Sequence, residues 1–433
     1  MKSIGIGLAG LGTVGGGTID LLKENKEEIK KKAGGELNVV GIADIDTGKI
    51  ASKKYCEMKV FTDAMQLLEL DEVEVVVELI GGETFAKDFV ISAINSGKHI
   101  VTANKALLAK HGNEIFDLAT RKNVFIGYEA AIAGGIPVVK ALREGLSGNN
   151  ITLIAGILNG TTNFILSEME NSGASFDDAL AQATALGYAE LDPTLDIDGY
   201  DSAHKIALLS SIAFGVKVDL ASVSVSGIRN LSLKEVSYAK QLGYRIKLLA
   251  VTRKVDGKIE LNVAPSLIPL PELMSNIDGA MNAVEVRGDF VGQTLYYGQG
   301  AGAKPTASSV VADLIDIARF GSQSKVPAFS YQPEYLKTLT LLTSSSVIVG
   351  RYVRLKVLDE PGVLASITSE LAKNDVSIDC FFQKKVDEKE GCTDVILLTH
   401  PCSGKNISQS MSEISKFDTV VDSPVILRVE SFQ

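Results

Sequence analysis

Residues 3–15 read SIGIGLAGLGTVG, and the expected fold of the first 130 residues follows from them. The small and apolar run at 3–9 predicts a buried strand, and the glycine-rich turn at 10–15 opens a helix that we expect to continue to about Lys32. Further apolar strands are expected at 39–43, 73–79 and 99–102, with helices between them. Strands and helices that alternate in this way predict an α/β domain with a doubly wound parallel sheet of the Rossmann type.

The turn GLGTVG matches G-x-G-x-x-G, a pattern typical of dinucleotide-binding loops when it follows a strand and opens a helix. Gly10 permits the tight turn, Gly12 leaves space for a pyrophosphate, and Gly15 allows the helix to pack closely on the strand. Thr13 and Val14 begin the helix, whose free N–H groups attract phosphate. This context favours bound NAD(P) over a glycine-rich turn without a ligand.

Asp44 ends the second expected strand. A carboxylate at this position accepts hydrogen bonds from the adenosine ribose hydroxyls and repels a 2′-phosphate, so we expect NAD to be preferred over NADP. The alternative is a turn aspartate that faces water, because Lys49, Lys53 and Lys54 follow and could attract a phosphate.

The composition is that of an ordinary globular protein, with 45% hydrophobic and 22% charged residues in a chain of 433. The formal net charge of −10 argues against nucleic acid or an anionic membrane as the main partner. We find no targeting segment at the N-terminus and no apolar run of the roughly 18 residues that span a bilayer. The four cysteines are scattered without metal-ligand spacing, which indicates a reducing cytoplasm.

Beyond residue 130 the pattern changes. Mixed strands and helices over 131–302 predict an α+β domain, and a helix near 306–319, within 303–340, is expected to return to the first domain. A serine-rich linker follows at 341–349. Residues 350–433 alternate in the order β-α-β-β-α-β, which is the ferredoxin-like plan.

Five further segments carry a resemblance to a known family. They read ELIGG at 78–82, TANK at 102–105, EAAIAGGIP at 129–137, GILNGTTN at 156–163 and LGYAELDP at 186–193. With Asp201 and Lys205 after them, the chain resembles homoserine dehydrogenase over about residues 1–320. The resemblance implies interconversion of L-aspartate 4-semialdehyde and L-homoserine with NAD(P)H, and an α+β domain that serves catalysis and dimerisation.

Asp201 and Lys205 are four residues apart on an expected helix, so they share one face. A lysine in a partly dry pocket can have a lowered pKa and act as a general acid. Lys205 would then protonate the oxygen in reduction and remove its proton in oxidation, while Asp201 orients Lys205 or the substrate amine. From spacing alone, a solvated surface ion pair explains the two residues as well.

Three residues are expected near the substrate because of the resemblance. Glu190 matches the family's ligand for the substrate ammonium, and Asp196 shapes the loop and touches substrate. Lys105 follows a short strand at the carboxyl edge of the sheet, and it would lie at the nicotinamide and polarise the carbonyl. Read in isolation, these residues are an ordinary acidic turn and a lysine in solvent.

The segment from Glu129 resembles the family's monovalent cation site. There a glutamate and backbone carbonyls, which match Ile132, Gly134 and Ile136, hold Na⁺ with hard oxygen ligands. The alternative is a strained hinge without an ion. Gly302, which precedes the returning helix, is expected to approach the dinucleotide or to form a simple turn.

The sequence DEPGVL at 359–364 resembles the ACT domain, an amino-acid-sensing module. Gly362 leaves backbone N–H groups open to an amino-acid carboxylate near a helix N-terminus. Threonine, the end product downstream of homoserine, is the leading candidate effector, and the alternative is a structural, dimer-forming sheet edge. The resemblance also implies a homodimer or homotetramer.

Other classes of protein fit less well. Aspartate-semialdehyde dehydrogenase needs a nucleophilic cysteine in the middle of the chain, and no cysteine lies between residues 57 and 379. Sugar dehydrogenases of similar layout carry Glu-Lys-Pro where this chain has Asn104-Lys105-Ala106. A sensor that binds NAD and an amino acid without catalysis would not need both Asp201 and Lys205.

Overall fold

The computed structural model describes residues 2–51, 53–321, 326–384 and 391–432. The chain divides into two compact units that are each assembled from several segments. The first unit consists of Met1–Gly160, Asp201–Val223 and Ala280–Leu339, and the second of Thr161–Tyr200, Ser224–Gly279 and Thr340–Gln433. The domain boundaries expected from the sequence stay a prediction.

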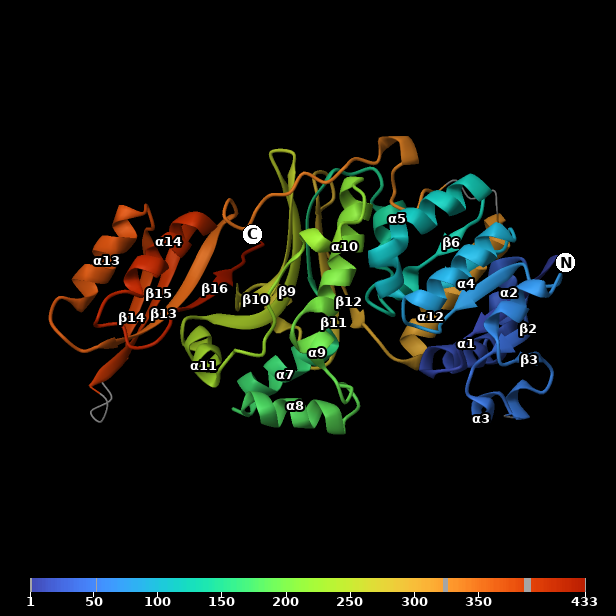
Figure 1. The fold of residues 1–433 in the computed structure, drawn as a ribbon, viewed down its shortest axis with the longest axis horizontal. Helices are drawn as coiled ribbons and strands as arrows, with labels where there is room; N and C mark the ends of the chain where they lie inside the picture. Colours follow the sequence, from blue (N-terminus) through green and yellow to red (C-terminus); the bar gives the residue numbers. More distant parts are fainter. Residues whose placement is uncertain (1, 52, 322–325, 385–390, 433) are drawn as a thin grey trace. The chain divides into compact units, whose positions relative to one another are not determined.

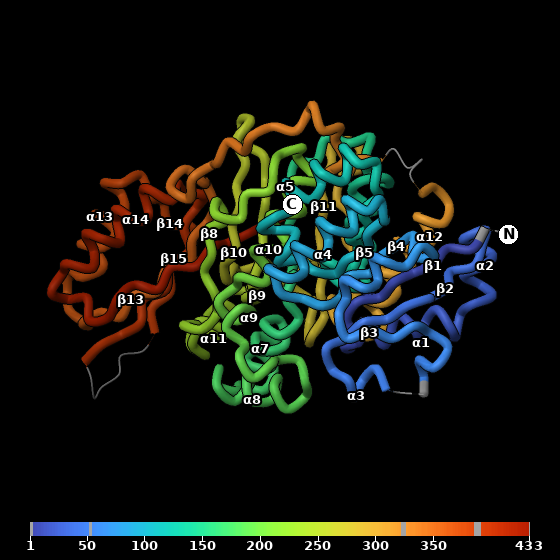
Figure 2. Tube along the Cα trace, turned by 45° about the vertical axis from the view of Figure 1, so that its right-hand side comes forward, coloured from blue at the N-terminus to red at the C-terminus, as the bar shows by residue number. Residues whose placement is uncertain are grey.

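The first unit contains a six-stranded sheet in the order β3-β2-β1-β4-β5-β6, in which every neighbouring pair is parallel (Figure 1, Figure 2). The strands are β1 (Lys2–Ala9), β2 (Gly35–Ala43), β3 (Lys59–Phe61), β4 (Val75–Glu78), β5 (His99–Thr102) and β6 (Ile126–Gly127). The predicted α/β fold with a Rossmann-type parallel sheet is confirmed. The strand order reverses between β1 and β4, and folds of this kind bind ligands at the carboxyl ends of the strands beside such a reversal.

The expected single helix after β1 is wrong, because the chain forms two helices, α1 (Thr13–Glu24) and α2 (Lys26–Ala33). Asn25 separates them with φ −105° and ψ 21°, outside the helical range. The second helix has acidic residues in its first turn and lysines in its last, a distribution that suits the dipole of an independent helix. The apolar pattern continues across the break, which explains why periodicity did not reveal it.

The other helices of this part are α3 (Thr47–Ile50), α4 (Thr84–Asn95), α5 (Lys105–Lys122) and α12 (Ala303–Phe320). Helix α12 packs on α1 and α2, and α4 packs on α5. Apolar side chains of β1, β4, α1 and α12 form the core, among them the fully buried Ile6, Leu8, Ile19 and Val310. Each such side chain contributes about 1.5–3 kcal/mol of burial free energy.

The rest of the first unit supplies a second, antiparallel group of strands and one long helix. The strand β11 (Met281–Gly288) lies between β7 (Ile151–Ile157) and β12 (Gly292–Gln299). Residues 201–214 of α10 (Tyr200–Phe214) belong to this unit, and nearly all of their side chains are buried. A short helix, α6 (Val138–Lys140), continues as a π-helical turn at Ala141–Gly145.

The second unit contains a sheet in the order β9-β10-β16-β13-β15-β14 (Figure 1). Its strands are β9 (Tyr244–Val255), β10 (Lys258–Pro269), β13 (Ile348–Leu358), β14 (Ile378–Gln383), β15 (Cys392–Ser403) and β16 (Val425–Val429), and the short β8 (Ser224–Val225) pairs with β10. Its helices are α7 (Gly160–Asn171), α8 (Phe176–Ala185), α9 (Thr194–Ile197), α11 (Leu233–Gln241), α13 (Val363–Lys373) and α14 (Gly404–Ile414).

The C-terminal segment follows the expected order of strand, helix, two strands, helix and strand, from β13 to β16. The first strand begins at Ile348, inside the stretch expected to be a linker. Helices α13 and α14 pack on each other and share an apolar core with the sheet, which includes Val353, Ile367 and Met411. The last strand, β16, also pairs with β10, so this segment continues a sheet that begins outside it.

No helix in the described part of the chain combines the length and the apolar character that crossing a membrane requires.

Candidate active site

The glycine-rich loop between β1 and α1 has the geometry of a phosphate-binding turn. Gly10 has φ +97°, and a Cβ at Gly10 or Gly15 would lie 2.4 Å or 1.9 Å from a backbone oxygen. Around Gly12, in contrast, a Cβ would meet no atom within 4 Å. Gly12 is the N-cap of α1, and no side chain caps this helix. The loop therefore has the open space and the uncapped N–H groups that a pyrophosphate needs.

Asp44 lies directly after β2, beside this loop. Its Oδ2 accepts a hydrogen bond of 2.6 Å from the backbone N–H of Leu11, and its Oδ1 accepts one from Asp46 N–H at 2.9 Å. Lys54 contacts the start of α1, where its Nζ donates to the Gly16 carbonyl at 3.3 Å and lies 2.6 Å from Asp20. The carboxylate is thus fixed at the loop, and the nearby lysine already has an acidic partner.

A buried network at the ends of β4 and β5 holds the start of α5. Glu78 is fully buried, and its Oε2 accepts a hydrogen bond of 2.6 Å from the Thr102 hydroxyl. The Thr102 oxygen in turn accepts from the Asn104 N–H at 3.0 Å, and the Asn104 side chain caps α5 by accepting from Leu107 N–H. Lys105, the first residue of α5, is therefore anchored at the carboxyl edge of the sheet.

Asp201 and Lys205 lie together on α10, and neither is a solvated surface residue. Lys205 is 8% exposed, and its Nζ donates to Asp201 Oδ2 at 2.8 Å and to the Leu158 carbonyl at 2.6 Å. Asp201 Oδ2 also accepts from the Asn159 amide at 2.9 Å, and Asp201 Oδ1 lies 3.0 Å from Lys105 Nζ. Two lysines from different elements thus converge on one carboxylate.

The electrostatics of this cluster keep Asp201 ionised. Burial raises the pKa of the Asp201 carboxyl, but the positive charges of Lys205 and Lys105 and the Asn159 amide outweigh burial and hold this pKa well below its usual range. Burial also lowers the pKa of the neighbouring His204, so this imidazole is neutral near pH 7. The cluster therefore consists of one carboxylate anion that two lysine side chains contact.

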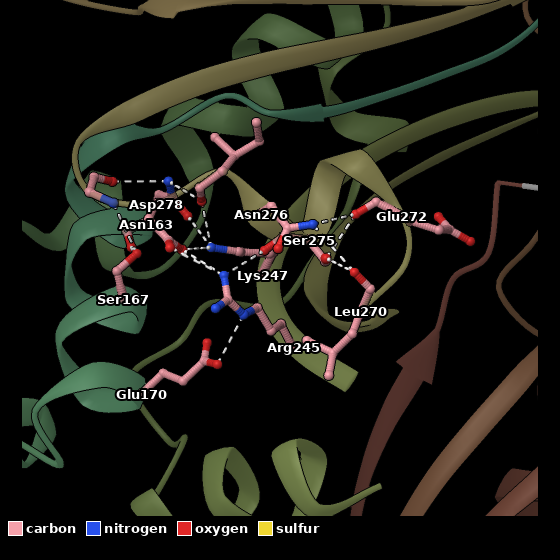
Figure 3. A network of polar contacts seen from close by, with 12 residues as sticks. Asn163, Ser167, Glu170, Arg245, Lys247, Leu270, Glu272, Ser275, Asn276 and Asp278 are labelled. Carbon is pink, nitrogen blue, oxygen red and sulfur yellow. Dashed lines mark hydrogen bonds and ion pairs between the residues drawn. The ribbon is translucent and has the colours of Figure 1, made fainter. Parts of the chain in front are cut away.

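In the second unit, a polar network around Lys247 fixes helix α7 to the segment that follows β10 (Figure 3). Lys247 is 1% exposed, and its Nζ donates to Asn163 Oδ1, to the Ile277 carbonyl and to Asp278 Oδ1 at 3.2, 2.5 and 3.1 Å. The Asn163 amide donates to the carbonyls of Ile277 and Gly279 at 3.0 and 2.9 Å. The start of α7 is therefore rigidly held.

The same helix holds the loop that carries Glu190. The Thr161 hydroxyl donates to the Tyr188 carbonyl at 2.6 Å, and the rings of Phe164 and Tyr188 lie 5.0 Å apart. Glu190 is exposed, and Asp196 is half-buried on the short helix α9. Both residues belong to the second unit, whereas Lys105, Asp201 and Lys205 belong to the first, so their expected meeting at one substrate stays a prediction.

Glu129 is buried and faces the start of α6. Its two carboxylate oxygens accept hydrogen bonds from the N–H groups of Val139 and Lys140 at 2.9 and 2.8 Å. Burial, together with the charge of Asp313, raises the pKa of Glu129 to about 7. The Gly134 carbonyl accepts from Ser309 at 2.7 Å. These contacts show a densely bonded segment.

The described residues include no group of three or more histidine, cysteine, aspartate or glutamate side chains that could hold a metal. Gly302 has φ +120° and is the N-cap of α12, with no side chain capping the helix.

Several contributors to the site were not identified from the sequence. Asn159 and the Leu158 carbonyl reach Asp201 and Lys205 across 42 and 47 residues of chain, and no local pattern reveals such contacts. Glu78, Thr102 and Thr161 lie within the segments that carried the family resemblance, but their positioning roles follow only from the folded chain. The occurrence of polar residues at strand ends was the one available signal.

Comparison with known proteins gives consistent results over the full chain. The family model "Homoserine dehydrogenase, NAD binding domain" matches residues 10–129, and "Homoserine dehydrogenase" matches residues 137–315. The homoserine dehydrogenase of Neisseria gonorrhoeae is 48% identical over 435 residues, covering 100% of this chain and 99% of that protein. The one from Pseudomonas aeruginosa is 46% identical over 439 residues, with 99% of both chains covered.

Comparison with solved structures gives the same family. A homoserine dehydrogenase from Thiobacillus denitrificans superposes with a TM-score of 0.95 at 48% identity and covers 100% of this chain and 99% of its own. A hyperthermophilic archaeal homoserine dehydrogenase in complex with NADPH gives a TM-score of 0.61 at 28% identity and covers 73% of this chain and 97% of its own.

Proposed function

Because the chain belongs to the homoserine dehydrogenase family and is thus an NAD(P)-dependent oxidoreductase, we propose that its substrates are L-homoserine and L-aspartate 4-semialdehyde. The observation that carries the proposal is the cluster of Lys205, Asp201 and Lys105 in the first unit, in which Lys205 and Asp201 are buried. This unit also contains the glycine-rich loop, so the residues proposed to transfer the proton and those proposed to bind the dinucleotide belong to one compact body.

The nicotinamide, when bound, supplies or accepts the hydride at the carbon that bears the oxygen. Lys205 gives a proton to that oxygen in reduction and takes the hydroxyl proton in oxidation. Asp201 holds the Lys205 ammonium in place from 2.8 Å, and the Leu158 carbonyl fixes it from a second direction. Lys105, whose side chain is 38% exposed, places a positive charge where the carbonyl oxygen becomes more negative.

We assign recognition of the substrate's amino group to residues of the second unit. The exposed carboxylate of Glu190 suits the substrate ammonium, and Asp196 is placed beside it in the sequence. The hydrogen bond from Thr161 to Tyr188 supports this role, because it restrains the loop that presents Glu190.

We propose that NAD is preferred over NADP. Gly10, Gly12, Thr13, Val14 and Gly15 form the pyrophosphate turn, and Gly302 approaches the dinucleotide from α12. The fixed carboxylate of Asp44 would repel a 2′-phosphate, and the ion pair of Lys54 with Asp20 weakens the competing attraction. Comparison of kcat/KM for NADH and NADPH tests this preference, and a clear advantage for NADPH would contradict it.

A monovalent cation, Na⁺, is proposed at the segment that begins with Glu129. The Glu129 carboxylate is already engaged by two N–H donors, so backbone carbonyls are the fitting ligands, those of Glu129, Ile132, Gly134 and Ile136. A carbonyl has two lone pairs, so the hydrogen bonds accepted by the carbonyls of Glu129, Gly134 and Ile136 leave one lone pair on each. The ion would stabilise the segment and take no part in proton transfer.

The C-terminal segment is proposed to be an ACT-like regulatory domain with threonine as its effector. The order of its elements supports this, and Gly362, with φ +93°, leaves open space at the N-terminus of α13. Titration of the activity with threonine tests the assignment. If threonine neither binds nor inhibits at millimolar concentration, the segment is structural.

We propose that the enzyme is a homo-oligomer, at least a dimer, that works in the cytoplasm. The strand β12 lies at the edge of its sheet, and the nearby Phe290 and Tyr297 are 91% and 57% exposed. All four cysteines are free, which suits a reducing compartment. Sedimentation of the purified chain would show the oligomeric state.

The proposed reaction is tested by following reduction of NAD, and then of NADP, in the presence of L-homoserine. 4-Hydroxybutyrate, which lacks the ammonium group, serves as the matched poor substrate. We expect homoserine-dependent reduction and a much lower kcat/KM for 4-hydroxybutyrate. If a folded sample binds NAD but oxidises neither compound, the chain is a sensor or acts on another alcohol.

A further inference from the structure

The first unit contains a cavity that the proposed reaction does not use. It has a volume of about 280 Å³ and lies between the C-terminal half of α5, the strand β6 and residues 326–336. None of Lys105, Asp201 and Lys205 lines it. The volume is near the lower end of the range for small-molecule sites.

Aromatic rings form one part of the walls of this cavity. Phe116 and Phe329 line it, with ring centroids 4.7 Å apart in an edge-to-face arrangement. Phe116 also contacts the buried ring of Tyr128 at 5.2 Å, and the Tyr128 hydroxyl donates to the Ala328 carbonyl. These contacts fix the walls, so the cavity is preformed.

Arg143 supplies a buried positive charge at the cavity. It is 8% exposed and lies in the π-helical turn after α6. Its guanidinium lies over the Tyr128 ring at 5.7 Å, and its Nε has no hydrogen-bond partner. Asp313 is the buried carboxylate whose pKa responds to Arg143, but Asp313 forms its ion pair with Lys140 at 3.2 Å.

The described residues therefore provide no salt-bridge partner for Arg143. Residues 322–325, which lie outside the described part, read SQSK and contain no carboxylate. Asp117 and Lys217 also line the cavity, but both are exposed and their charges offset each other. Arg143 is thus a buried cation without an ion pair of its own, since Asp313 is paired with Lys140, and an anion is the expected complement of this cavity.

We propose that the cavity is a binding site for a small amphiphilic carboxylate. Its carboxylate pairs with the Arg143 guanidinium, which offers a fork of donors suited to two oxygens. Its apolar part packs against Phe116 and Phe329. The site is lined by the C-terminal half of α5, whereas Lys105 is the first residue of that helix. It is independent of the proposed substrate site.

The probe for this site is 4-fluorobenzoate, followed by ¹⁹F NMR on the full chain without nicotinamide or homoserine. We expect saturable binding with a Kd of about 1 mM or tighter. The neutral 4-fluorobenzyl alcohol is expected to bind at least about tenfold more weakly, because it lacks the charge-assisted hydrogen bonds.

Three variants locate the probe. Arg143→Gln removes the charge, and Thr120→Trp adds a large side chain at an exposed position of α5 that lines the cavity, so this second variant carries the test if the first does not fold. Arg121→Gln is the matched control, an exposed arginine of the same helix that does not line the cavity. Loss of affinity of at least about tenfold in the first two and none in the third supports the proposal.

Three outcomes would overturn this assignment. The first is no saturable binding to the unmodified chain, and the second is equal binding of the alcohol. The third is unchanged affinity in the Thr120→Trp variant, which would place the probe elsewhere, for example at Lys205. Failure of the proposed dehydrogenase reaction would leave all of these readouts intact.

Discussion

Replacement of Asp201 by asparagine keeps the shape of the side chain but removes the charge that two lysines share. The carboxylate accepts from Lys205 and Asn159 on one oxygen and faces Lys105 with the other, at 2.8, 2.9 and 3.0 Å. Asparagine has a single acceptor oxygen. In either orientation of the amide, its NH₂ group faces a donor, so the variant loses both charge and hydrogen bonds.

The size of the effect follows from these contacts. A charge-assisted hydrogen bond contributes about 1.5–3 kcal/mol, and about 1.4 kcal/mol corresponds to one pH unit. The Asp201 carboxylate favours the ammonium form of Lys205, whereas homoserine oxidation needs the neutral amine. Without that charge the neutral amine forms at lower pH, so the acid limb of kcat/KM moves down by about one to two pH units. Misorientation of Lys205 lowers the plateau by about tenfold or more.

The assay is the pH profile of homoserine oxidation, with Asp88→Asn as the matched control. Asp88 is an exposed carboxylate on α4, outside the cluster. We expect Asp88→Asn to reproduce the unmodified profile. A profile for Asp201→Asn with the same acid limb and plateau as the unmodified enzyme would refute the coupling between Asp201 and Lys205.

Three further predictions concern the loop, the buried carboxylate and the substrate loop. Gly12→Ala adds a Cβ in open space, so it should leave the free energy of unfolding unchanged but weaken NAD binding at least about tenfold. The Cβ of Gly15→Ala would lie 1.9 Å from a backbone oxygen, so this variant should lower both the free energy of unfolding and the NAD affinity. Calorimetry measures NAD binding, and an unchanged affinity for Gly12→Ala would contradict the prediction. Glu129 has its pKa raised from 4.5 to about 7, so between these pH values the unfolded chain loses the proton first, and rising pH lowers the free energy of unfolding by up to about 3 kcal/mol. Glu129→Gln should remove this part of the slope in urea unfolding at several pH values, and an unchanged slope would count against it. Thr161→Val should raise KM for homoserine about three- to tenfold with less effect on kcat, Thr161→Ser should restore it, and an effect on kcat alone would argue against a role in holding the loop at 186–193.

Local sequence patterns were sufficient to predict most of the fold. The strand and glycine-rich turn at 3–15 sufficed for the parallel sheet, because a short motif and the alternation after it restrict the topology strongly. The break at Asn25 was not foreseen, since the apolar positions of α1 and α2 stay in register across it. Nor was the pairing of β16 with β10, which joins residues about 160 positions apart in sequence.

The charged residues of the candidate site could be predicted from the sequence, but the residues that bury and position them could not. The spacing of Asp201 and Lys205 placed them on one helical face, and their ion pair is present. Burial of Lys205 and the contribution of Asn159 depend on segments far away in the chain. Spacing alone could not separate this pair from a surface ion pair, because the dry environment that changes its chemistry is a property of the folded unit.

The central claim is that Lys205 transfers the proton, and Lys205→Ala tests it most directly. Homoserine-dependent reduction of the nicotinamide is compared with that of Lys258→Ala, an exposed lysine, while calorimetry checks that both variants still bind NAD. We predict that kcat of Lys205→Ala falls by about 10²- to 10⁴-fold with NAD affinity unchanged, and that Lys258→Ala keeps full activity. A folded, NAD-binding Lys205→Ala enzyme that retains kcat within about threefold would contradict the account.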